Sequence, residues 1–438
     1  MPIELSPSVQ AAPAEFGPRR RIAVIGAGVA GLTAAHVLQR AHDVTLFERN
    51  GYFGGHTHTV TIESGPDAGL AVDTGFIVYN DRNYPTFRRL LAQLGVASQP
   101  SDMSFSFHCE GSGFQYAGNG VRGLFAQRRN LVRPAFARML LDIARFNRRA
   151  RADLATGALA GVTLGDYVDG LSLSRGFADW YLYPMAAAIW STPAAQVRQF
   201  PAMTFVRFFD QHGLLALAGA PPWRTVTGGS RTYVDRLMAG FKGTAHRGAG
   251  VRAVTRQADG AEVRLDRECV RFDAVVVATH ADEALALLAD PTPEERRELG
   301  AWRYSVNRAV LHTDAASLPP RRAAWSSWNY VRESGTGNSG ESPVSMTYWM
   351  NRLQRLPSTR PYCVSLNRAR PIEDRHVIRE LTYTHPCFTP ASLASQRALP
   401  SLQGTRNTWF CGSYFGYGFH EDAVRSACDV ARGFGLEL

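Results

Sequence analysis

Two histidines are the first residues whose types and spacing could do chemistry. His56 and His58 lie two residues apart in the stretch FGGHTHTV (53–60), directly after the glycine pair Gly54 and Gly55. Alternate residues of an extended strand point to one face, as a pair of metal ligands would require. The two imidazoles could instead transfer a proton near neutral pH, or belong to a loop beside a bound cofactor. The residues that precede this stretch decide among the three interpretations.

Residues 20–48 follow the order strand, glycine-rich turn, helix and second strand. RIAVIGA reads as a short buried strand, and Gly26, Gly28 and Gly31 complete the pattern G-x-G-x-x-G. These glycines allow a tight turn, close approach of a pyrophosphate and close packing of helix on strand, respectively. The second strand ends at Glu48, whose carboxylate can accept hydrogen bonds from ribose hydroxyls and disfavours a 2′-phosphate. The order predicts a dinucleotide site with the phosphates at the helix N-terminus.

The stretch after Glu48 favours FAD over NAD. Gly54 and Gly55 lie where a second close approach of the backbone to the pyrophosphate would be useful, and AVDTGF (71–76) adds a strand and another glycine turn. This arrangement resembles the FAD-binding segment shared by flavin amine oxidases, carotenoid desaturases and protoporphyrinogen oxidases. No third metal ligand is evident nearby in the sequence, so we expect no metal. We expect His56 beside the FAD phosphates or ribityl chain, and His58 nearer the flavin ring.

Three later stretches match the same superfamily in the same order. They are RTVTGGSRTYVDRL (224–237), FDAVVVATHADEAL (272–285) and NTWFCGSYFGYGFHEDAVRSACDVARGF (407–434). More narrowly, FGGHTHTV, FIVYNDRNYPTF, YLYPMAAAIWSTP, AAWSSWNY and GSYFGYGFHEDAVRSA resemble a bacterial group of predicted NAD/FAD-binding oxidoreductases. Members of that group are often encoded beside cyclopropane-fatty-acid-synthase-like methyltransferases. The resemblance thus implies a methyltransferase partner and work on unsaturated or methylated acyl chains.

The fold class implied by this resemblance is α/β, in two domains. We expect a Rossmann-like FAD domain of the glutathione-reductase type, discontinuous over 20–100, 218–285 and 402–438. The intervening segments, 101–217 and 286–401, are expected to form an α+β substrate domain. The first of them has helical spacing of apolar residues and the second has alternating stretches typical of strands. Residues 1–19 are expected to be a mobile tail.

The glycine pattern and the resemblance together predict the cofactor-binding residues. They are Gly26, Gly28, Ala30, Gly31, Glu48, Arg49, Gly54, Gly55, His56, Thr57, Gly75, Phe76, Gly228, Val254, Thr279, Gly412, Ser413, Gly418, Phe419, His420 and Glu421. The N–H groups of Phe419 and His420, at the start of the last helix, are expected to stabilise negative charge on the flavin. A base must take the proton that accompanies hydride loss, and His56, His58 and Tyr79 are the catalytic candidates.

Composition limits the other classes of function. The chain has 438 residues, a net charge of +10 and six cysteines without a C-x-x-C pair. The scattered cysteines argue against a zinc or iron–sulfur site and for a cytoplasmic protein, and the N-terminus does not read as a secretory signal. No motif typical of nucleic-acid binding is present.

Lys242 is the only lysine and lies in a polar connection. This weakens the simple amine-oxidase interpretation, because many amine oxidases of this superfamily hold a water at the flavin with a lysine.

The arginine-rich segment 121–154 has two interpretations. Its apolar residues at helical spacing predict an amphipathic helix with a solvated basic face. The alternative is contact with an anionic membrane surface, because arginines beside leucine, phenylalanine and methionine suit such an interface. The second interpretation would make the protein peripheral on the inner membrane.

Three hypotheses of function follow. The leading one is an FAD-dependent oxidoreductase that removes hydride from an apolar substrate, a desaturase of a modified fatty acyl chain. Aromatic and methionine residues of the inserts, such as Trp190, Phe208 and Trp328, would then line an apolar tunnel. The second is an amine or amino-acid oxidase. The third is a lipid-binding or scaffolding partner of a methyltransferase in which FAD is mainly structural.

Overall fold

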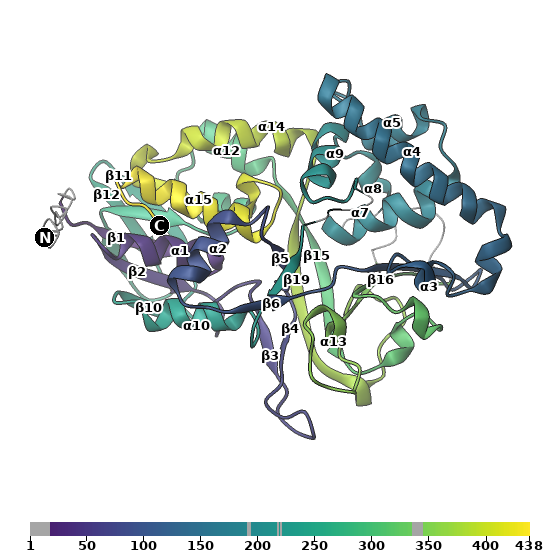
Figure 1. Cartoon of the computed structure of the whole chain (residues 1–438). Coiled ribbons are helices and arrows are strands. Elements are labelled where there is room, and N and C mark those ends of the chain that lie inside the picture. The colour runs from purple at the N-terminus through teal and green to yellow at the C-terminus, as the bar shows by residue number, and fades with distance from the viewer. Residues whose placement is uncertain (1–17, 191–193, 217–218, 220, 335–344) are drawn as a thin grey trace, which may run out of the picture.

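The computed structural model describes residues 18–190, 194–216, 219, 221–334 and 345–438 (Figure 1). Residues 1–17 of the expected tail lie outside the described residues. Arg19, the last residue of that tail, forms an exposed ion pair with Asp43 at 2.7 Å.

A five-stranded parallel sheet forms the first half of the fold. Its order is β10-β2-β1-β14-β20. The strands are β1 (Arg21–Ile25), β2 (Asp43–Glu48), β10 (Thr244–Arg247), β14 (Ala274–Val277) and β20 (Thr408–Phe410). Residues 22–25 of β1 and the whole of β14 are continuous apolar runs, as expected of parallel strands that are covered on both faces.

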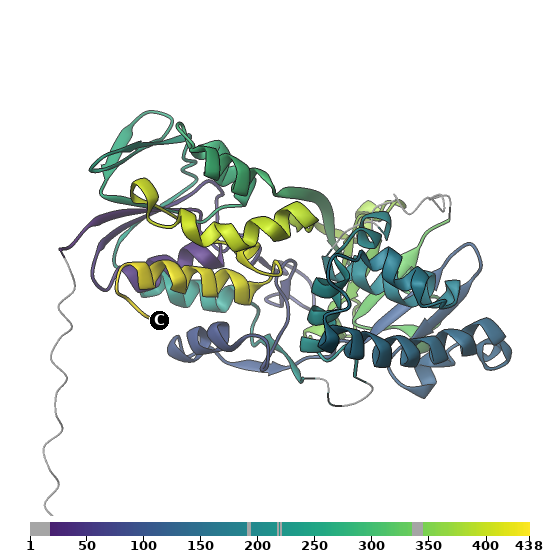
Figure 2. The same ribbon diagram turned by 90° about the horizontal axis from the view of Figure 1, so that it is seen from above.

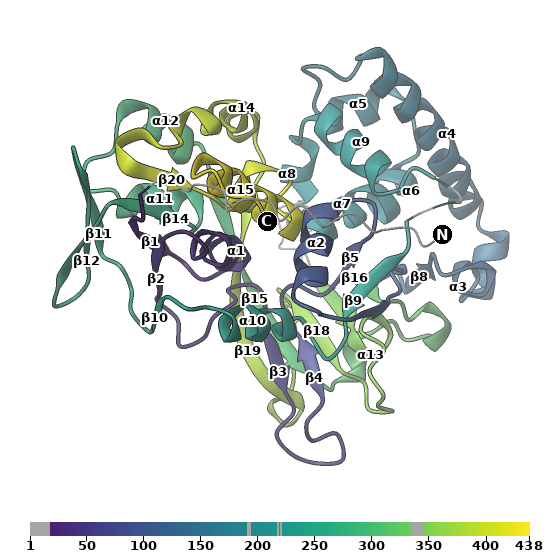
Figure 3. The same cartoon turned by 60° about the vertical axis from the view of Figure 1, so that its left-hand side comes forward.

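Helices cover one face of this sheet and a meander covers the other. α1 (Val29–Leu38), α10 (Arg231–Ala239) and α15 (His420–Gly433) share a core with Ile22, Val24 and Val276. Figure 3 shows α1 and α15 side by side. The antiparallel strands β11 (Ala253–Gln257), β12 (Gly260–Arg264) and β13 (Cys269–Phe272) pack on the other face. The result is the Rossmann-like α/β fold that the sequence predicts.

A seven-stranded sheet forms the second half, in the order β19-β15-β18-β17-β16-β7-β8. The strands are β7 (Phe105–Cys109), β8 (Phe114–Ala117), β15 (Arg303–His312), β16 (Trp328–Arg332), β17 (Met346–Trp349), β18 (Cys363–Leu366) and β19 (Val377–Cys387). The strands predicted in the second insert are confirmed as β15, β17 and β18. Both inserts contribute to this one sheet, because β7 pairs in parallel with β16.

A group of helices lies beside the seven-stranded sheet, in the lobe opposite the parallel sheet (Figure 2). It comprises α3 (Val121–Leu124), α4 (Pro134–Thr156), α5 (Leu164–Gly170), α6 (Arg175–Phe177), α7 (Tyr183–Trp190), α8 (Ala194–Arg198) and α9 (Ala202–Gln211). The segment predicted as one amphipathic helix is divided. A 3-10 turn at Arg128–Val132 separates α3 from α4, and Pro134 begins α4 because its fixed φ suits the first helical position. Phe136, Met139 and Phe146 form the buried stripe of α4.

Short strands connect the two halves. β3 (Thr59–Thr61) pairs with β4 (Ala71–Asp73), and β9 (Trp223–Val226) lies between β5 (Tyr79–Asn80) and β6 (Ser98–Pro100). The remaining helices are α2 (Pro85–Gln93), α11 (Ala281–Leu287), α12 (Pro293–Gly300), α13 (Met350–Leu353) and α14 (Pro390–Ala398). In the described part of the chain, no helix is long and apolar enough to cross a membrane.

Asp73, at the end of β4, is a fully buried carboxylate that joins three parts of the chain. It accepts from the N–H of Ser230, just before α10, at 2.9 and 3.0 Å, and from the hydroxyl of Thr59. Gln354 of the second half donates its side-chain amide to Asp73 at 2.9 Å and accepts the Asp73 N–H at 2.9 Å. Burial raises the pKa of Asp73 to about 6. These bonds connect the FAD-side strands to the second sheet.

A buried ion pair provides a test of stability. The Arg256 guanidinium is completely buried, pairs with Glu295 of α12 and donates to the Asp290 carboxylate at 2.9 Å. Glu295→Ala would remove the fully buried one of its two carboxylate partners and leave only Asp290, which is shared with Arg406, so we expect a loss of about 3 kcal/mol in the free energy of unfolding. Urea denaturation followed by circular dichroism measures it. Asp266→Ala, which breaks the exposed pair with Arg252, is the control and should leave the midpoint nearly unchanged. Equal midpoints for the two variants would contradict this assignment.

Candidate functional site

A cavity of about 820 Å³ extends from the parallel sheet to the seven-stranded sheet. At one end its wall contains the loops after β1 and β2, including Gly26, Gly28 and Glu48. At the other end it contains Trp328 and Tyr348 of the second sheet. The cavity therefore lies at the carboxyl ends of the parallel strands, where open α/β sheets bind their ligands.

The glycine-rich turn has one tightly packed side and one open side. A side chain cannot fit where α1 packs on the turn, but there is free space on the side that faces the cavity. A Cβ at Gly31 would lie 1.8 Å from the Gly26 carbonyl oxygen, and Gly26 itself has a φ of +98°. A Cβ at Gly28 would meet no protein atom within 4 Å, although Gly28 lines the cavity. The open space beside the Gly28 backbone, at the N-terminus of α1, fits the pyrophosphate of a dinucleotide.

The second glycine pair lies directly against this turn. The Gly54 N–H donates to the Ala27 carbonyl at 2.8 Å, and Gly28 and Gly54 form an isolated parallel bridge. A Cβ at Gly55 would lie 3.1 Å from the Gly28 Cα. The backbone of the two glycine stretches thus forms one continuous surface of the cavity.

Glu48 has a structural role that the sequence did not reveal. Its carboxylate is buried and accepts from the N–H groups of Ala27 and Asn50, each at 2.8 Å. It therefore holds the glycine-rich turn against the end of β2, and it still lines the cavity, where ribose hydroxyls can reach its remaining lone pairs. Its neighbour Arg49 also lines the cavity and pairs with Glu283 at 2.7 Å.

His56 is part of the cavity wall. Its Nε2–H donates to the Thr384 carbonyl at 3.0 Å, which leaves Nδ1 as the unprotonated nitrogen. Its ring centroid lies 5.2 Å from that of Tyr383, 5.6 Å from His385 and 5.9 Å from His280. Burial and the neighbouring histidines lower the pKa of His56 well below its usual value, so the ring is neutral.

His58 lies outside the cavity wall, which differs from its expected place nearer the flavin ring. Its ring centroid lies 4.7 Å from that of Tyr52, and Nδ1 lies 3.0 Å from the Thr74 hydroxyl. The strand begins at Thr59, so the stretch expected to place both imidazoles on one face is a turn at the glycine pair. In the parts of the chain that the model describes, no group of three histidine, cysteine, aspartate or glutamate side chains could hold a metal ion.

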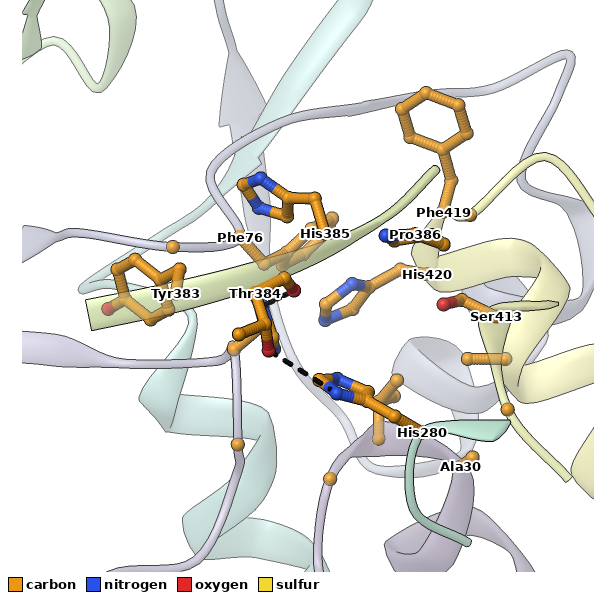
Figure 4. A pocket seen from close by; sticks show the side chains of 18 of the residues that line it. Ala30, Phe76, His280, Tyr383, Thr384, His385, Pro386, Ser413, Phe419 and His420 are labelled. Atoms are coloured by element: carbon orange, nitrogen blue, oxygen red, sulfur yellow. Dashed lines mark hydrogen bonds between the residues drawn. The ribbon is translucent and has the colours of Figure 1, made fainter. Parts of the chain in front are cut away.

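Three further imidazoles lie near His56 on the wall. Figure 4 shows His280, His385 and His420 around Thr384. His280 lies 3.3 Å from the Thr384 hydroxyl, and Asn307 contacts Nδ1 of His385 at 3.2 Å. Burial lowers the pKa of His385 to about 4 and that of His420 to about 3. All four rings are therefore uncharged at neutral pH.

The start of α15 differs in part from the prediction. His420 stacks on Phe76 at 3.6 Å between centroids, and its Nε2 lies 3.0 Å from the Thr57 hydroxyl. The Phe419 N–H is already used, because it donates to the Asp422 carboxylate at 3.1 Å. It is therefore not free for the flavin, whereas the His420 N–H, at the first helical position, has no acceptor within the helix.

Glu421 points away from the cavity. Its two carboxylate oxygens accept from the N–H groups of Thr86 and Phe87 at 3.0 and 2.9 Å and so cap the N-terminus of α2. The Glu421 side chain is therefore engaged with α2, and Glu421 is not on the cavity wall, so its role in cofactor binding stays a prediction. A carboxylate in the first turn of a helix suits either role, and only the fold brings α2 within reach of this one.

The other predicted residues divide between the wall and its surroundings. Those on the wall are Gly26, Gly28, Ala30, Glu48, Arg49, Gly54, Gly55, His56, Gly75, Phe76, Thr279, Gly412, Ser413, Gly418, Phe419 and His420. Those off the wall are Gly31, Thr57, His58, Tyr79, Gly228, Val254 and Glu421. Tyr79 is buried in β5, and Val254 is buried in β11. The Thr57 hydroxyl forms hydrogen bonds with His420 and with the Tyr233 hydroxyl.

None of the predictions from the sequence included the wall residues His280, Tyr383, Thr384 and His385. His280 directly follows the predicted Thr279, so its position after a buried strand was an available signal. The other three lie on β19, more than 300 residues from His56 in the chain, and no local pattern marks them. The hydroxyl of Tyr383 lies 2.8 Å from that of Thr74, which connects β19 to the AVDTGF turn.

The far end of the cavity is apolar apart from the neutral imidazole of His212, which stacks on Phe208. It is lined by Met103, Phe105, Met185, Ile189, Trp190, Phe208, Leu214, Trp223, Trp328, Tyr348, Leu353, Leu366, Phe388 and Tyr417. Of the predicted aromatic lining, Trp190, Phe208 and Trp328 are on the wall. The charged residues of the described lining are Glu48, Arg49, Arg252 and Glu283. They lie near the end of β2, since Ala249 donates to the Glu48 carbonyl at 2.8 Å and Arg49 pairs with Glu283.

Known proteins share both the sequence and the fold. The model of the family "Flavin containing amine oxidoreductase" matches residues 29–433. A Mycobacterium tuberculosis protein named flavin-containing monoamine oxidase AofH is 27% identical over 350 residues, which cover 75% of this chain and 70% of the relative. The CLA-producing fatty acid isomerase from P. acnes has a TM-score of 0.63 at 18% identity, with 95% and 98% of the two chains covered. Cyclohexylamine oxidase from Brevibacterium oxydans has a TM-score of 0.67 at 14% identity, covering 95% and 99%.

The family match covers most of the chain, and the glycine turns, the Glu48 carboxylate and the open space at Gly28 fit a flavin dinucleotide. The cofactor is FAD. The chain belongs to the flavin containing amine oxidoreductase family and is an FAD-dependent oxidoreductase.

Proposed function

We propose that this oxidoreductase desaturates an apolar chain and that its substrate is a modified fatty acyl group. The proposal is based on the distribution of side chains along the cavity, where charged and apolar residues lie at opposite ends. Its charged side chains gather near the end of β2, and its far end is lined by apolar and aromatic side chains. An acyl chain gains free energy by leaving water for such a lining, whereas an ammonium group would lose its hydration without an ionic partner.

The likeness in fold to a fatty acid isomerase supports this substrate class, since the same architecture serves acyl chemistry in that protein. The four neutral imidazoles support it as well, because they supply polar contacts without fixed charge. A methyltransferase that modifies the acyl chain remains the partner implied by the sequence resemblance.

We propose that the glycine turns at Gly26–Gly31 and Gly54–Gly55 hold the FAD pyrophosphate and that Glu48 binds the ribose. When bound, FAD supplies the hydride acceptor. Removal of hydride from one carbon and of a proton from its neighbour leaves a carbon–carbon double bond. The unprotonated Nδ1 of His56 is the proposed proton acceptor, because the Nε2–H bond to Thr384 fixes its tautomer.

An amine oxidase is the second candidate. It is favoured by the 27% identity to a protein named as a monoamine oxidase. Such a substrate would have to enter this cavity as the neutral amine. Lys242, the one lysine in the chain, is exposed before β10 and outside the cavity wall, so it is no candidate for chemistry at the flavin.

Anaerobic mixing separates the two candidates. Oleoyl and methyl-branched unsaturated acids in detergent micelles are compared with benzylamine and putrescine. We expect an acyl substrate to bleach the oxidised-flavin absorbance in a single turnover and the amines to leave it unchanged, because the described lining of the far end has no carboxylate to pair with an ammonium group. Bleaching by an amine and by none of the acids would overturn the desaturase proposal.

Gly28→Ala tests the cofactor position. The new methyl group meets no protein atom, and Gly28 has a φ of −70° that alanine adopts readily, so folding should be unaffected. The methyl group would fill the proposed pyrophosphate space at a cost of about 1–3 kcal/mol, so FAD should bind about tenfold or more weakly. Equilibrium dialysis with FAD measures the loss. Gly51→Ala, also without neighbours within 4 Å, is the control and should retain full affinity. Unchanged affinity in Gly28→Ala would place the pyrophosphate elsewhere.

His56→Asn tests the proton acceptor against His58→Asn. We expect His56→Asn to slow flavin reduction by about 10²–10⁴-fold and His58→Asn to leave it near the wild-type rate. Because burial lowers the pKa of His56, the wild-type imidazole stays unprotonated as the pH falls through 6.5, and the rate of reduction should stay level there. Stopped-flow reduction at a series of pH values measures both effects. A slow His58→Asn with a normal His56→Asn would assign the proton to the other histidine.

A further inference from the structure

An exposed group of aliphatic and arginine side chains lies at the end of the molecule opposite the parallel sheet (Figures 1 and 3). It is formed by α3 and the 3-10 turn before α4. The exposed fractions are 73% for Val121, 64% for Leu131 and 82% for Val132. Arg122, Arg128 and Arg129 are exposed among them. We call these six residues the basic apolar patch.

The exposure is built into the fold. Asn130, in the middle of the turn, is buried, and its side-chain amide donates to the carbonyls of Gln115 at 3.0 Å and Leu124 at 3.2 Å. The Gln115 N–H also donates to the Gln127 side chain at 3.1 Å. These bonds fix the turn to β8 and to the end of α3. The residues on either side of Asn130 are therefore held outward, with their aliphatic groups in water at a cost in free energy.

Positive charge is in excess around the patch. Segment 121–154 contains nine arginines and two aspartates. Both aspartates are buried and paired: Asp142 with Arg138 and Arg145, and Asp153 with Arg149. Within the described structure, no acidic side chain forms an ion pair with the three arginines of the patch. These cations are free to meet an anionic surface.

We propose that the basic apolar patch docks the protein on an anionic lipid surface. The aliphatic side chains enter the boundary between headgroups and acyl chains, and the arginines bind the phosphates of the headgroups. The partner is a lipid surface because aliphatic groups are interleaved with uncompensated cations and the patch has no aromatic residue to act as a protein anchor. The proposal rests on the proposed acyl substrate, since such chains reside in membranes.

Vesicle flotation of the holoprotein tests the docking without any turnover, so its failure is distinct from failure of the desaturase assignment. We expect binding to vesicles that contain phosphatidylglycerol, no binding to phosphatidylcholine alone, and weaker binding as salt rises. Arg128→Glu/Arg129→Glu should weaken binding by about tenfold or more. Arg264→Glu/Arg267→Glu makes the same change of charge on exposed arginines of the meander and should bind as the wild type.

A second pair of variants tests the contribution of the aliphatic side chains to vesicle binding. Val132→Asp should weaken flotation strongly, and Val306→Asp, at an exposed valine of β15, should not. Circular dichroism and FAD content verify that each variant is folded. Absence of binding to phosphatidylglycerol vesicles, or equal binding by the patch and control variants, would overturn the proposal. A wild-type dimer in sedimentation that Val132→Asp converts to a monomer would also overturn it, because a second copy would then cover the patch.

Discussion

The close approach of two glycine stretches is the constraint on which the site depends. Gly31 must lie against the Gly26 carbonyl for α1 to pack on β1, and Gly54 must lie within hydrogen-bond distance of Ala27. Side chains at these positions would separate α1, the turn and the segment after β2. Glu48 holds the same turn against β2 through the Ala27 N–H, so the carboxylate proposed to bind the ribose also fixes the glycine-rich turn. The parallel sheet positions all of these groups because β1 and β2 end at the same edge.

The second sheet completes the cavity with groups that carry no charge. β19 delivers Thr384 and His385 to the wall opposite the glycine turns, and the Thr384 carbonyl fixes the tautomer of His56. Burial keeps the imidazoles neutral, so the middle of the cavity has hydrogen-bonding capacity without a fixed ion. Beyond them the wall is apolar. This gradient suits the charged dinucleotide at one end and the apolar chain that we propose as substrate at the other.

The sequence predicts the local parts of the site well and the distant parts poorly, for a physical reason. G-x-G-x-x-G, the glycine pair and Glu48 act through backbone geometry over a few residues, so their spacing is visible in the chain. His385 lies beside His56 only because the fold brings β19 next to the turn after Gly55. No local pattern in the sequence predicts a contact between segments so far apart in the chain. The acids of α15 were ambiguous for a different reason. Glu421 caps α2 and Asp422 accepts from Phe419, and a helix N-terminus next to a cofactor looks the same in sequence as one whose acids serve the protein itself.

Asp73 holds parts of the site in position although it does not line the cavity. The AVDTGF stretch was interpreted through Gly75, which does line the cavity. The buried carboxylate two residues earlier instead holds the segment before α10 and the Gln354 amide of the second half. Its pKa, raised to about 6 by burial, indicates that the charged form is maintained at neutral pH by these hydrogen bonds rather than by an ionic partner. Replacing Asp73 would therefore disturb the position of the second sheet, and with it Thr384 and His385, before it disturbed the glycine cradle.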